Sequence, residues 1–226
     1  MKELPTLPTS ADPGPPKLRG WFHAGMVPLV IASGVVLITV AKTTAAKVAG
    51  SVFQASAFLL FANSALYHLG HWGKKVAGVL RRFDHSNIAL IIAGTYTPLA
   101  VILLDAGQRN LLLWLIWGGA LTAITVRLVW MEAPRWSYVP IYIALGWTAL
   151  WFMPSLWRSG GPAVVWLLLA GGLSYTGGAV IYALKRPNPW PKWLGFHELF
   201  HIGTLGGYTC HFLAVMMVTL RQTVPA

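Results

Sequence analysis

Seven apolar stretches, each long enough to form a membrane-spanning helix, constrain this 226-residue chain more than any other feature. A transmembrane helix needs about 20 mostly apolar residues to cross the hydrocarbon core of a bilayer. The stretches cover residues 21–41, 48–69, 84–104, 111–130, 138–157, 162–184 and 195–220. They lack the alternating pattern of an outer-membrane β-barrel. The sequence therefore predicts an all-α integral membrane protein with seven transmembrane helices.

The composition supports this class. Charged residues make up 10% of the chain and hydrophobic residues 56%, whereas an average soluble domain has about 25% charged residues. High hydrophobicity excludes the disordered class, and the single cysteine, Cys210, excludes a disulfide-rich secreted scaffold. Five of the 15 prolines lie in the first 20 residues. We expect a disordered tail over residues 1–20, which is not a signal peptide, and one seven-helix domain over residues 21–226.

The lysine and arginine residues predict the orientation of the helices. Short cytoplasmic loops carry an excess of these cations, and a cytoplasmic N-terminus places 12 of the 17 on the cytoplasmic side. Those 12 are Lys2, Lys17, Arg19, Lys74, Lys75, Arg81, Arg82, Arg127, Arg135, Lys185, Arg186 and Lys192. We therefore expect the N-terminus inside and the C-terminus outside a cell membrane, with the chain crossing it several times. The basic loops are suited to anionic lipid headgroups, and no nucleic-acid-binding module accompanies them.

Histidines gather at one predicted membrane face. In this orientation, six of the seven lie near the cytoplasmic side, and His211 lies about three helical turns deeper. The six are His23, His68, His71, His85, His197 and His201. For His23, His71 and His85 the ordinary interpretation is a helix end or a contact with lipid headgroups. Ionisable residues at membrane depth are nevertheless functional candidates. Lysine and arginine alone predict the orientation, so the gathering of histidines at one face is an independent observation.

Three of these histidines and one aspartate have the spacing of a metal site. His197 and His201 lie four residues apart, about 40° around a helix axis and about 6 Å along it. His68 ends the second predicted span and Asp84 opens the third. Three neutral imidazoles with an open fourth position are typical of catalytic zinc. We predict metal-site residues His68, His197, His201 and Asp84.

Two catalytic residues follow from this arrangement. Asp84 would orient the zinc-bound water or act as a general base. Ser64, one turn deeper than His68 on the same helix face, would steady the site. Other interpretations stay open: the two histidines of the last span also suit helix packing, and Asp84 also suits an N-cap of the third span. Haem ligation by two histidines from two different helices is a further alternative. Glu198 lies on another helix face, which excludes the general base of an H-E-x-x-H metalloprotease.

The combination of these motifs resembles the haemolysin III family, the bacterial branch of the progestin and adipoQ receptor superfamily. The motifs are Ser64-x-x-x-His68, Asp84-x-Ser86-x-Ile88 leading into Gly94-Thr-Tyr-Thr-Pro98, and His197-x-x-x-His201. The resemblance covers residues 19–220. It implies seven helices with a cytoplasmic N-terminus and a zinc ion held near the cytoplasmic face by His68, His197 and His201. It also implies that Asp84 contacts the zinc-bound water and that Ser64 is the family's serine. Many bacterial members have a glutamate shortly before the first-span histidine, and this chain has none there.

The resemblance implies a function in lipid chemistry, because the superfamily includes alkaline ceramidases. The first expectation is a zinc-dependent hydrolase of a lipid amide or ester, with a ceramide-like substrate or a fatty acid product. The second is a non-enzymatic sensor or regulator of lipid state, in which the zinc is structural. The third is a cytolysin, although the sequence has no long amphipathic insertion segment. The expected location is the bacterial inner membrane, and the substrate and oligomeric state are left open.

Overall fold

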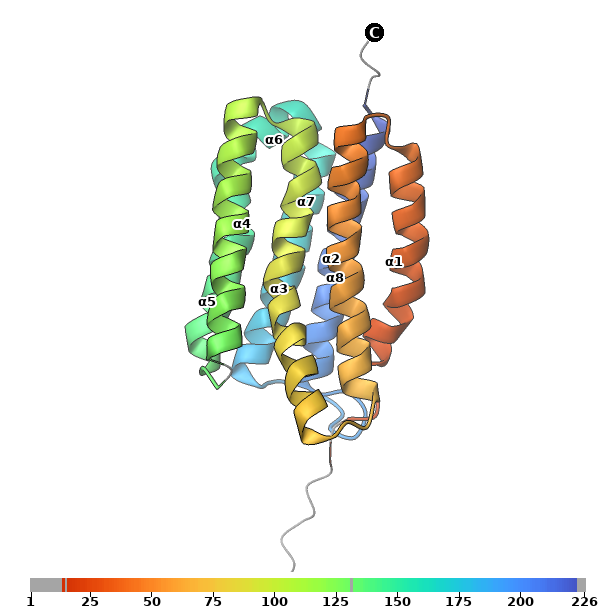
Figure 1. The fold of residues 1–226 in the computed structure, drawn as a ribbon, viewed down its shortest axis with the longest axis vertical. Helices are drawn as coiled ribbons and strands as arrows, with labels where there is room; N and C mark the ends of the chain where they lie inside the picture. The colour runs from red at the N-terminus through yellow and green to blue at the C-terminus, as the bar shows by residue number, and fades with distance from the viewer. Residues whose placement is uncertain (1–13, 15, 131, 223–226) are drawn as a thin grey trace, which may run out of the picture.

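The described residues form a bundle of helices whose axes are nearly parallel (Figure 1). The computed structural model describes residues 14, 16–130 and 132–222. Seven spans within these residues are long and apolar enough to cross a membrane, as predicted. Six are single helices: α1 (Trp21–Val40), α2 (Thr44–Leu69), α3 (Lys74–Leu103), α4 (Ala106–Val129), α7 (Pro162–Leu184) and α8 (Phe196–Leu220). The fifth consists of α5 (Arg135–Gly146), the 3₁₀-helix η1 (Trp147–Phe152) and α6 (Met153–Gly160).

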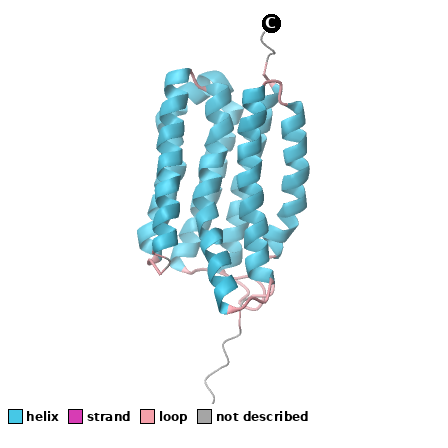
Figure 2. Cartoon of the chain, in the orientation of Figure 1, coloured by secondary structure: helices cyan, strands magenta, loops and turns pink. Residues whose placement is uncertain are grey.

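The loops are short and lie at the two ends of the bundle (Figure 2). Local sequence accounts for several helix starts. The Thr43 side chain accepts a hydrogen bond from the Ala46 N–H and caps α2, and Asp105 caps α4 through the Gln108 N–H. Pro162 is the first residue of α7, where a missing N–H costs little. Cap residues and a first-turn proline therefore set the starts of these three helices.

Helix α3 begins ten residues earlier than the predicted span. Only residues 70–73 separate α2 from α3, so the first turns of α3 carry Lys74, Lys75, Arg81 and Arg82. Figure 1 shows this end of α3 extending past the neighbouring helices. The prediction of a long basic loop between His68 and Asp84 is therefore wrong. Hydropathy detects only the part of a helix that is apolar, and it misses a polar extension of the same helix.

The segment before α1 is held against the bundle. The N–H groups of Lys17 and Leu18 donate hydrogen bonds to the carbonyl oxygens of Lys192 and Trp193, at 3.0 and 3.3 Å. Residues 16–20, part of the predicted disordered tail, therefore have defined contacts. Residues 1–13 and 15 of that tail lie outside the described residues.

Helices α7 and α8 approach closely through glycines, which fixes where the histidines of α8 lie. A Cβ built on Gly203 would stand 2.9 Å from the Gly178 Cα and 2.9 Å from the Ser174 carbonyl oxygen. The Ser174 hydroxyl also donates to the Gly203 carbonyl oxygen at 2.9 Å. In a membrane the hydrophobic effect does not drive helices together, because the lipid tails are themselves apolar. Close packing of small residues and hydrogen bonds from hydroxyl groups hold the helices together instead. The outer surface is correspondingly apolar, with Trp114, Trp151 and Val129 each more than 80% exposed.

Candidate metal centre

Three histidines from two helices meet at one end of the bundle. His68 lies in the last turn of α2, and His197 and His201 lie in the first two turns of α8. The Nε2 atoms of His68 and His197 are 3.2 Å apart. One ring nitrogen from each of the three histidines lies within 4.8 Å of the other two. The structure thus brings together the three histidines predicted as ligands into a cluster that could hold a metal ion.

The donor set, and the spacing of one pair within it, are compatible with zinc. At the usual Zn–N distance of about 2.0–2.1 Å, two ligands of a tetrahedral site lie about 3.3 Å apart, close to the separation of His68 and His197. The Nδ1 atom of His201 is buried and has no hydrogen-bond partner among the described residues. Buried polar atoms normally have a partner. Neutral imidazoles that face one another in this way are suited to a cation such as Zn²⁺.

Asp84 lies beside the cluster. Its Oδ2 is 3.9 Å from the His68 Nε2. The group of residues spaced to hold a metal ion consists of the three histidines and does not include Asp84. Asp84 sits in the third turn of α3, whose N-cap is Gly73. The capping interpretation of Asp84 is therefore wrong, because α3 begins ten residues before it. Ser64 is 1% exposed and lines the same cavity as Asp84, so both predicted catalytic residues border one space.

His23 belongs to the site, although its position at a helix end favoured a headgroup contact. It is 2% exposed and its ring stacks on that of His201, with ring centroids 3.8 Å apart and an interplanar angle of 10°. The His23 ring also meets the Phe61 ring in a T-shaped arrangement, with centroids 5.0 Å apart and an interplanar angle of 85°. Neither ring nitrogen of His23 has a hydrogen-bond partner among the described residues. The headgroup interpretation of His23 is thus wrong.

The remaining three histidines differ from one another. His71 is exposed in the loop between α2 and α3 and lies outside the cluster. The Nδ1 atom of His85 is 2.7 Å from a guanidinium nitrogen of Arg127. His211 lies deeper, with its Nε2 3.1 Å from the Leu168 carbonyl oxygen. Arg127, one of the 12 cations assigned to the cytoplasmic side, is 1% exposed within α4.

A buried ion pair fixes the start of α8 next to the histidines. The Arg19 Nε donates to the Glu198 Oε1 at 2.8 Å, and the Gly195 N–H donates to the Glu198 Oε2 at 2.8 Å. Glu198 is 0% exposed, and both of its carboxylate oxygens are occupied by these two contacts. The partner of Glu198 could not be predicted, because Arg19 is 179 residues away in the chain.

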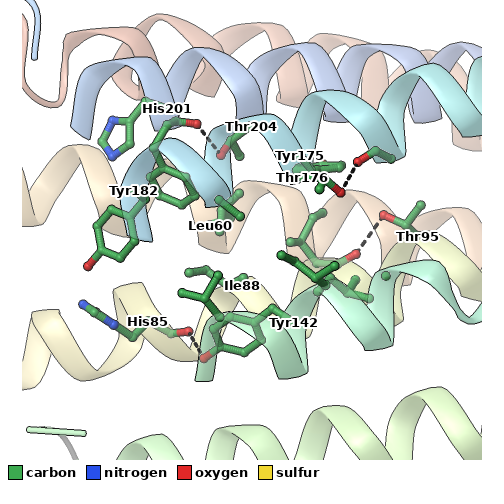
Figure 3. A pocket seen from close by; sticks show the side chains of 18 of the residues that line it. Leu60, His85, Ile88, Thr95, Tyr142, Tyr175, Thr176, Tyr182, His201 and Thr204 are labelled. Carbon is green, nitrogen blue, oxygen red and sulfur yellow. Dashed lines mark hydrogen bonds between the residues drawn. The ribbon is translucent and has the colours of Figure 1, made fainter. Parts of the chain in front are cut away.

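A cavity of about 1180 Å³, which includes open space at its mouth, extends from the histidines into the bundle. Its wall includes His201, Asp84, Ser64 and His85 at one end. Much of the remaining wall is apolar and includes Leu60, Ile88, Ile91, Ile92, Val139 and Ile143. In Figure 3, His201, Tyr182 and His85 mark one end, while Thr95, Tyr175 and Thr176 lie further along. The cavity could therefore hold an apolar chain whose polar end reaches the histidines.

These features define a class: a seven-span membrane protein whose buried histidines could hold a metal ion at the end of an apolar cavity. Comparison with known proteins agrees with that class. Residues 15–212 match the family described as Haemolysin-III related, so the chain belongs to the haemolysin III family.

Three relatives extend the comparison. Hemolysin-3 of Bacillus cereus is 33% identical over 178 residues, which cover 79% of this chain and 78% of that protein. The Hemolysin-3 homolog of Bacillus subtilis (strain 168) is 30% identical over 172 residues, covering 76% and 77%. The heptahelical transmembrane protein ADIPOR2 of Oryza sativa subsp. japonica is 26% identical over 192 residues, covering 77% and 84%. The expected link to the wider superfamily is thereby confirmed.

Proposed function

We propose that this chain is a zinc-dependent membrane hydrolase that cleaves an amide or ester bond of a lipid. The observation that carries the proposal is the position of the histidine cluster at the end of a largely apolar cavity. Asp84 and Ser64 border the same space. An apolar chain in the cavity would therefore present its polar end to the metal ligands and to a carboxylate.

The residues of the site have distinct tasks in this proposal. His68, His197 and His201 would hold zinc, which polarises a carbonyl group and lowers the pKa of a bound water to about 7. The Asp84 carboxylate accepts a proton as the new C–O bond forms, and it returns that proton to the departing amine or alkoxide as the C–N or C–O bond breaks. The apolar wall holds the acyl chain and excludes bulk water from the carboxylate.

Hydrolysis by purified protein tests the proposal. We expect wild type to release fatty acid from ceramide-like amides or from the matching esters. Asp84→Asn should retain its metal but lose activity by about 10²- to 10⁴-fold, because proton transfer typically contributes that much. His71→Ala is the matched control, since His71 is exposed and outside the cluster. Wild type that carries metal and leaves every tested lipid amide and ester intact would contradict the proposal.

A structural metal is the second candidate, favoured by the placement of the ligands on two helices. His68 ends α2 while His197 and His201 begin α8, so an ion would tie these two helices together. If the protein is a lipid sensor in which the metal ion ties α2 to α8, His68→Ala should lose much of its thermal stability and wild type should hydrolyse no lipid. Unchanged melting of His68→Ala would count against it. Leakage from liposomes tests the cytolysis that the name of Hemolysin-3 suggests.

We also propose that the histidine end faces the cytoplasm of a bacterial inner membrane. Lys74, Lys75 and Arg82 are exposed at this end of α3, as the positive-inside rule expects. Cys210 is the only cysteine, so a Cys210→Ser background allows single-cysteine labelling in intact cells. Cysteine at position 75 should resist an impermeant reagent, and cysteine at position 42 should react. The reverse pattern would overturn this orientation.

A further inference from the structure

Two cavities adjoin inside the bundle. The larger one begins at the histidine cluster, and its wall comes mainly from α3, α5, α7 and α8. The second has a volume of about 500 Å³ including open space, is mostly apolar, and reaches α4 at Leu112 and α6 at Leu156. Six residues border both cavities and therefore form a collar between them: Thr95, Tyr96, Gly146, Trp147, Gly172 and His211.

The collar lies at the end of the larger cavity that is remote from the histidine cluster. Figure 3 shows Thr95 and Thr176 further along the cavity than His201 and His85. Ten residues separate the two ends on each of three helices: His85 and Thr95 on α3, Tyr182 and Gly172 on α7, and His201 and His211 on α8. Because a helix rises about 1.5 Å per residue, the collar lies about 15 Å from the histidine end. Single bonds of about 1.52 Å at about 111° advance an extended alkyl chain by about 1.25 Å per carbon, so about 12 carbons span this distance.

Trp147 is the largest side chain of the collar, and α7 holds it in two ways. Its Nε1–H donates a hydrogen bond to the Thr176 Oγ1 at 3.0 Å. Its ring lies against Gly172, where an added Cβ would meet two ring carbons at 3.6 Å. Thr176 and Gly172 lie one turn apart on α7. The indole therefore cannot rotate out of the collar without breaking a hydrogen bond.

Backbone groups hold the other two rings of the collar. The Tyr96 hydroxyl donates to the Gly146 carbonyl oxygen and accepts from the Ala149 N–H at 2.8 Å, where α5 passes into η1. The His211 Nε2–H donates to the Leu168 carbonyl oxygen at 3.1 Å. Buried polar groups normally keep such partners, because an unpaired group in an apolar interior is costly. The collar is thus built from rings that are fixed in place.

We propose that this collar stops the apolar chain of a bound lipid, so that the protein selects lipids by chain length. Burying one more methylene group strengthens binding about fourfold. Affinity therefore rises until the chain reaches the collar, at about 12 carbons, and then levels off, because a longer chain must fold back or displace Trp147. That the chain belongs to a hydrolysable lipid rests on the proposed function, whereas selection by length is measured without turnover.

Three substitutions test the collar. Trp147→Ala removes the indole and joins the two cavities. Thr176→Val keeps the shape of the threonine side chain but removes the acceptor for the Trp147 Nε1–H, so the indole gains freedom to rotate. Trp151→Ala is the matched control, because Trp151 lies in the same 3₁₀-helix and is 82% exposed.

The experiment measures displacement of a fluorescent long-chain alcohol from purified, metal-loaded protein by saturated primary alcohols from octanol to eicosanol. Longer alcohols also enter the detergent more readily, so the quantity compared is the ratio of variant to wild-type affinity at each chain length. For Trp147→Ala we expect this ratio to be at least about tenfold higher for hexadecanol than for decanol, because several more methylene groups become buried. Thr176→Val should change in the same direction by a smaller factor. Trp151→Ala should give the same ratio at every chain length.

Photolabelling of wild type gives a result even if Trp147→Ala does not fold. The probe is hexadecanol with a photoreactive group at its chain end, and only labelling that excess hexadecanol prevents is counted. Among the described residues, α4 borders the second cavity at Leu112 but not the first. We therefore expect wild type to be labelled at the collar and not on α4, and folded Trp147→Ala to be labelled on α4 near Leu112.

The outcomes separate this inference from the proposed function. Labelling of α4 in wild type, or a Trp147→Ala ratio that is the same at every chain length, would overturn the inference. Lipid hydrolysis by wild type together with either result would leave the proposed function in place. Wild type that shows the expected chain-length limit and hydrolyses nothing would contradict the proposed function and support the collar.

Discussion

The imidazole rings of His23 and His201 lie face to face, 3.8 Å between centroids and 10° from parallel. His23 comes from the first turn of α1, while His201 is one of the clustered histidines of α8. The stack therefore limits rotation of the His201 ring. The restraint comes from α1, which contributes no member of the cluster. Groups that orient metal ligands in this way commonly matter almost as much as the ligands.

Removing the stack should weaken metal binding without removing a member of the cluster. We expect His23→Ala to lower zinc affinity by roughly tenfold, the lower end of the effect of losing an orienting partner. His23→Phe is the control, because a phenyl ring can stack on His201 and still pack against Phe61. Competition with a calibrated zinc chelator measures both variants. Equal affinity in wild type and His23→Ala would show that the stack does not orient His201.

The Arg19–Glu198 pair predicts a stability effect. Glu198 is fully buried and Arg19 is 26% exposed at the side chain. Removing one partner leaves the other uncompensated, so Glu198→Gln should lower the free energy of unfolding by roughly 2 kcal/mol or more. Glu132→Gln breaks the exposed Arg81–Glu132 pair and should cost less than about 1 kcal/mol. Denaturant titration in detergent compares them, and equal losses would contradict the structural role of Glu198.

The exposed cations at the start of α3 predict an interaction with anionic lipid. Lys74, Lys75 and Arg82 are exposed, whereas Arg81 is engaged with Glu132 at 3.3 Å. Replacing those three with glutamine should weaken binding of anionic lipid to the detergent-solubilised protein, with the largest effect at low salt. Lys42→Gln combined with Lys47→Gln is the matched control, since these exposed lysines lie at the other end of the bundle. Unchanged lipid binding in the triple variant would show that these cations do not bind lipid and serve only to set the orientation of the helices in the membrane.

Much of the fold could be predicted because each membrane span needs its own continuous apolar stretch, which can be read directly from the sequence. The sixth predicted span, residues 162–184, coincides with α7, and the seventh differs from α8 by one residue at its start. The three-histidine cluster was also predictable, because helical periodicity pairs His197 with His201. Antiparallel connections then bring the end of α2 to the start of α8. Helix α3 was predicted least well, because Lys74 to Phe83 continue a helix without being apolar enough to signal it.

Contacts between distant helices could not be predicted from the sequence. The stack of His23 on His201 and the pairing of Arg127 with His85 depend on which helices become neighbours and on their rotation. Arg127 lies near the cytoplasmic end of the predicted span 111–130, and charge at the end of an apolar stretch normally lies in water. In the structure its guanidinium is instead enclosed by aromatic and imidazole groups.

Metal analysis of the purified protein tests the account most directly. Elemental analysis of wild type and His201→Ala, with His71→Ala as the control, compares a buried member of the cluster with an exposed histidine outside it. We predict about one zinc ion per chain in wild type and His71→Ala, and a large loss in His201→Ala, because a site with only three protein ligands needs all three of them. Wild type without bound metal, or the same metal content in His201→Ala, would contradict the metal centre.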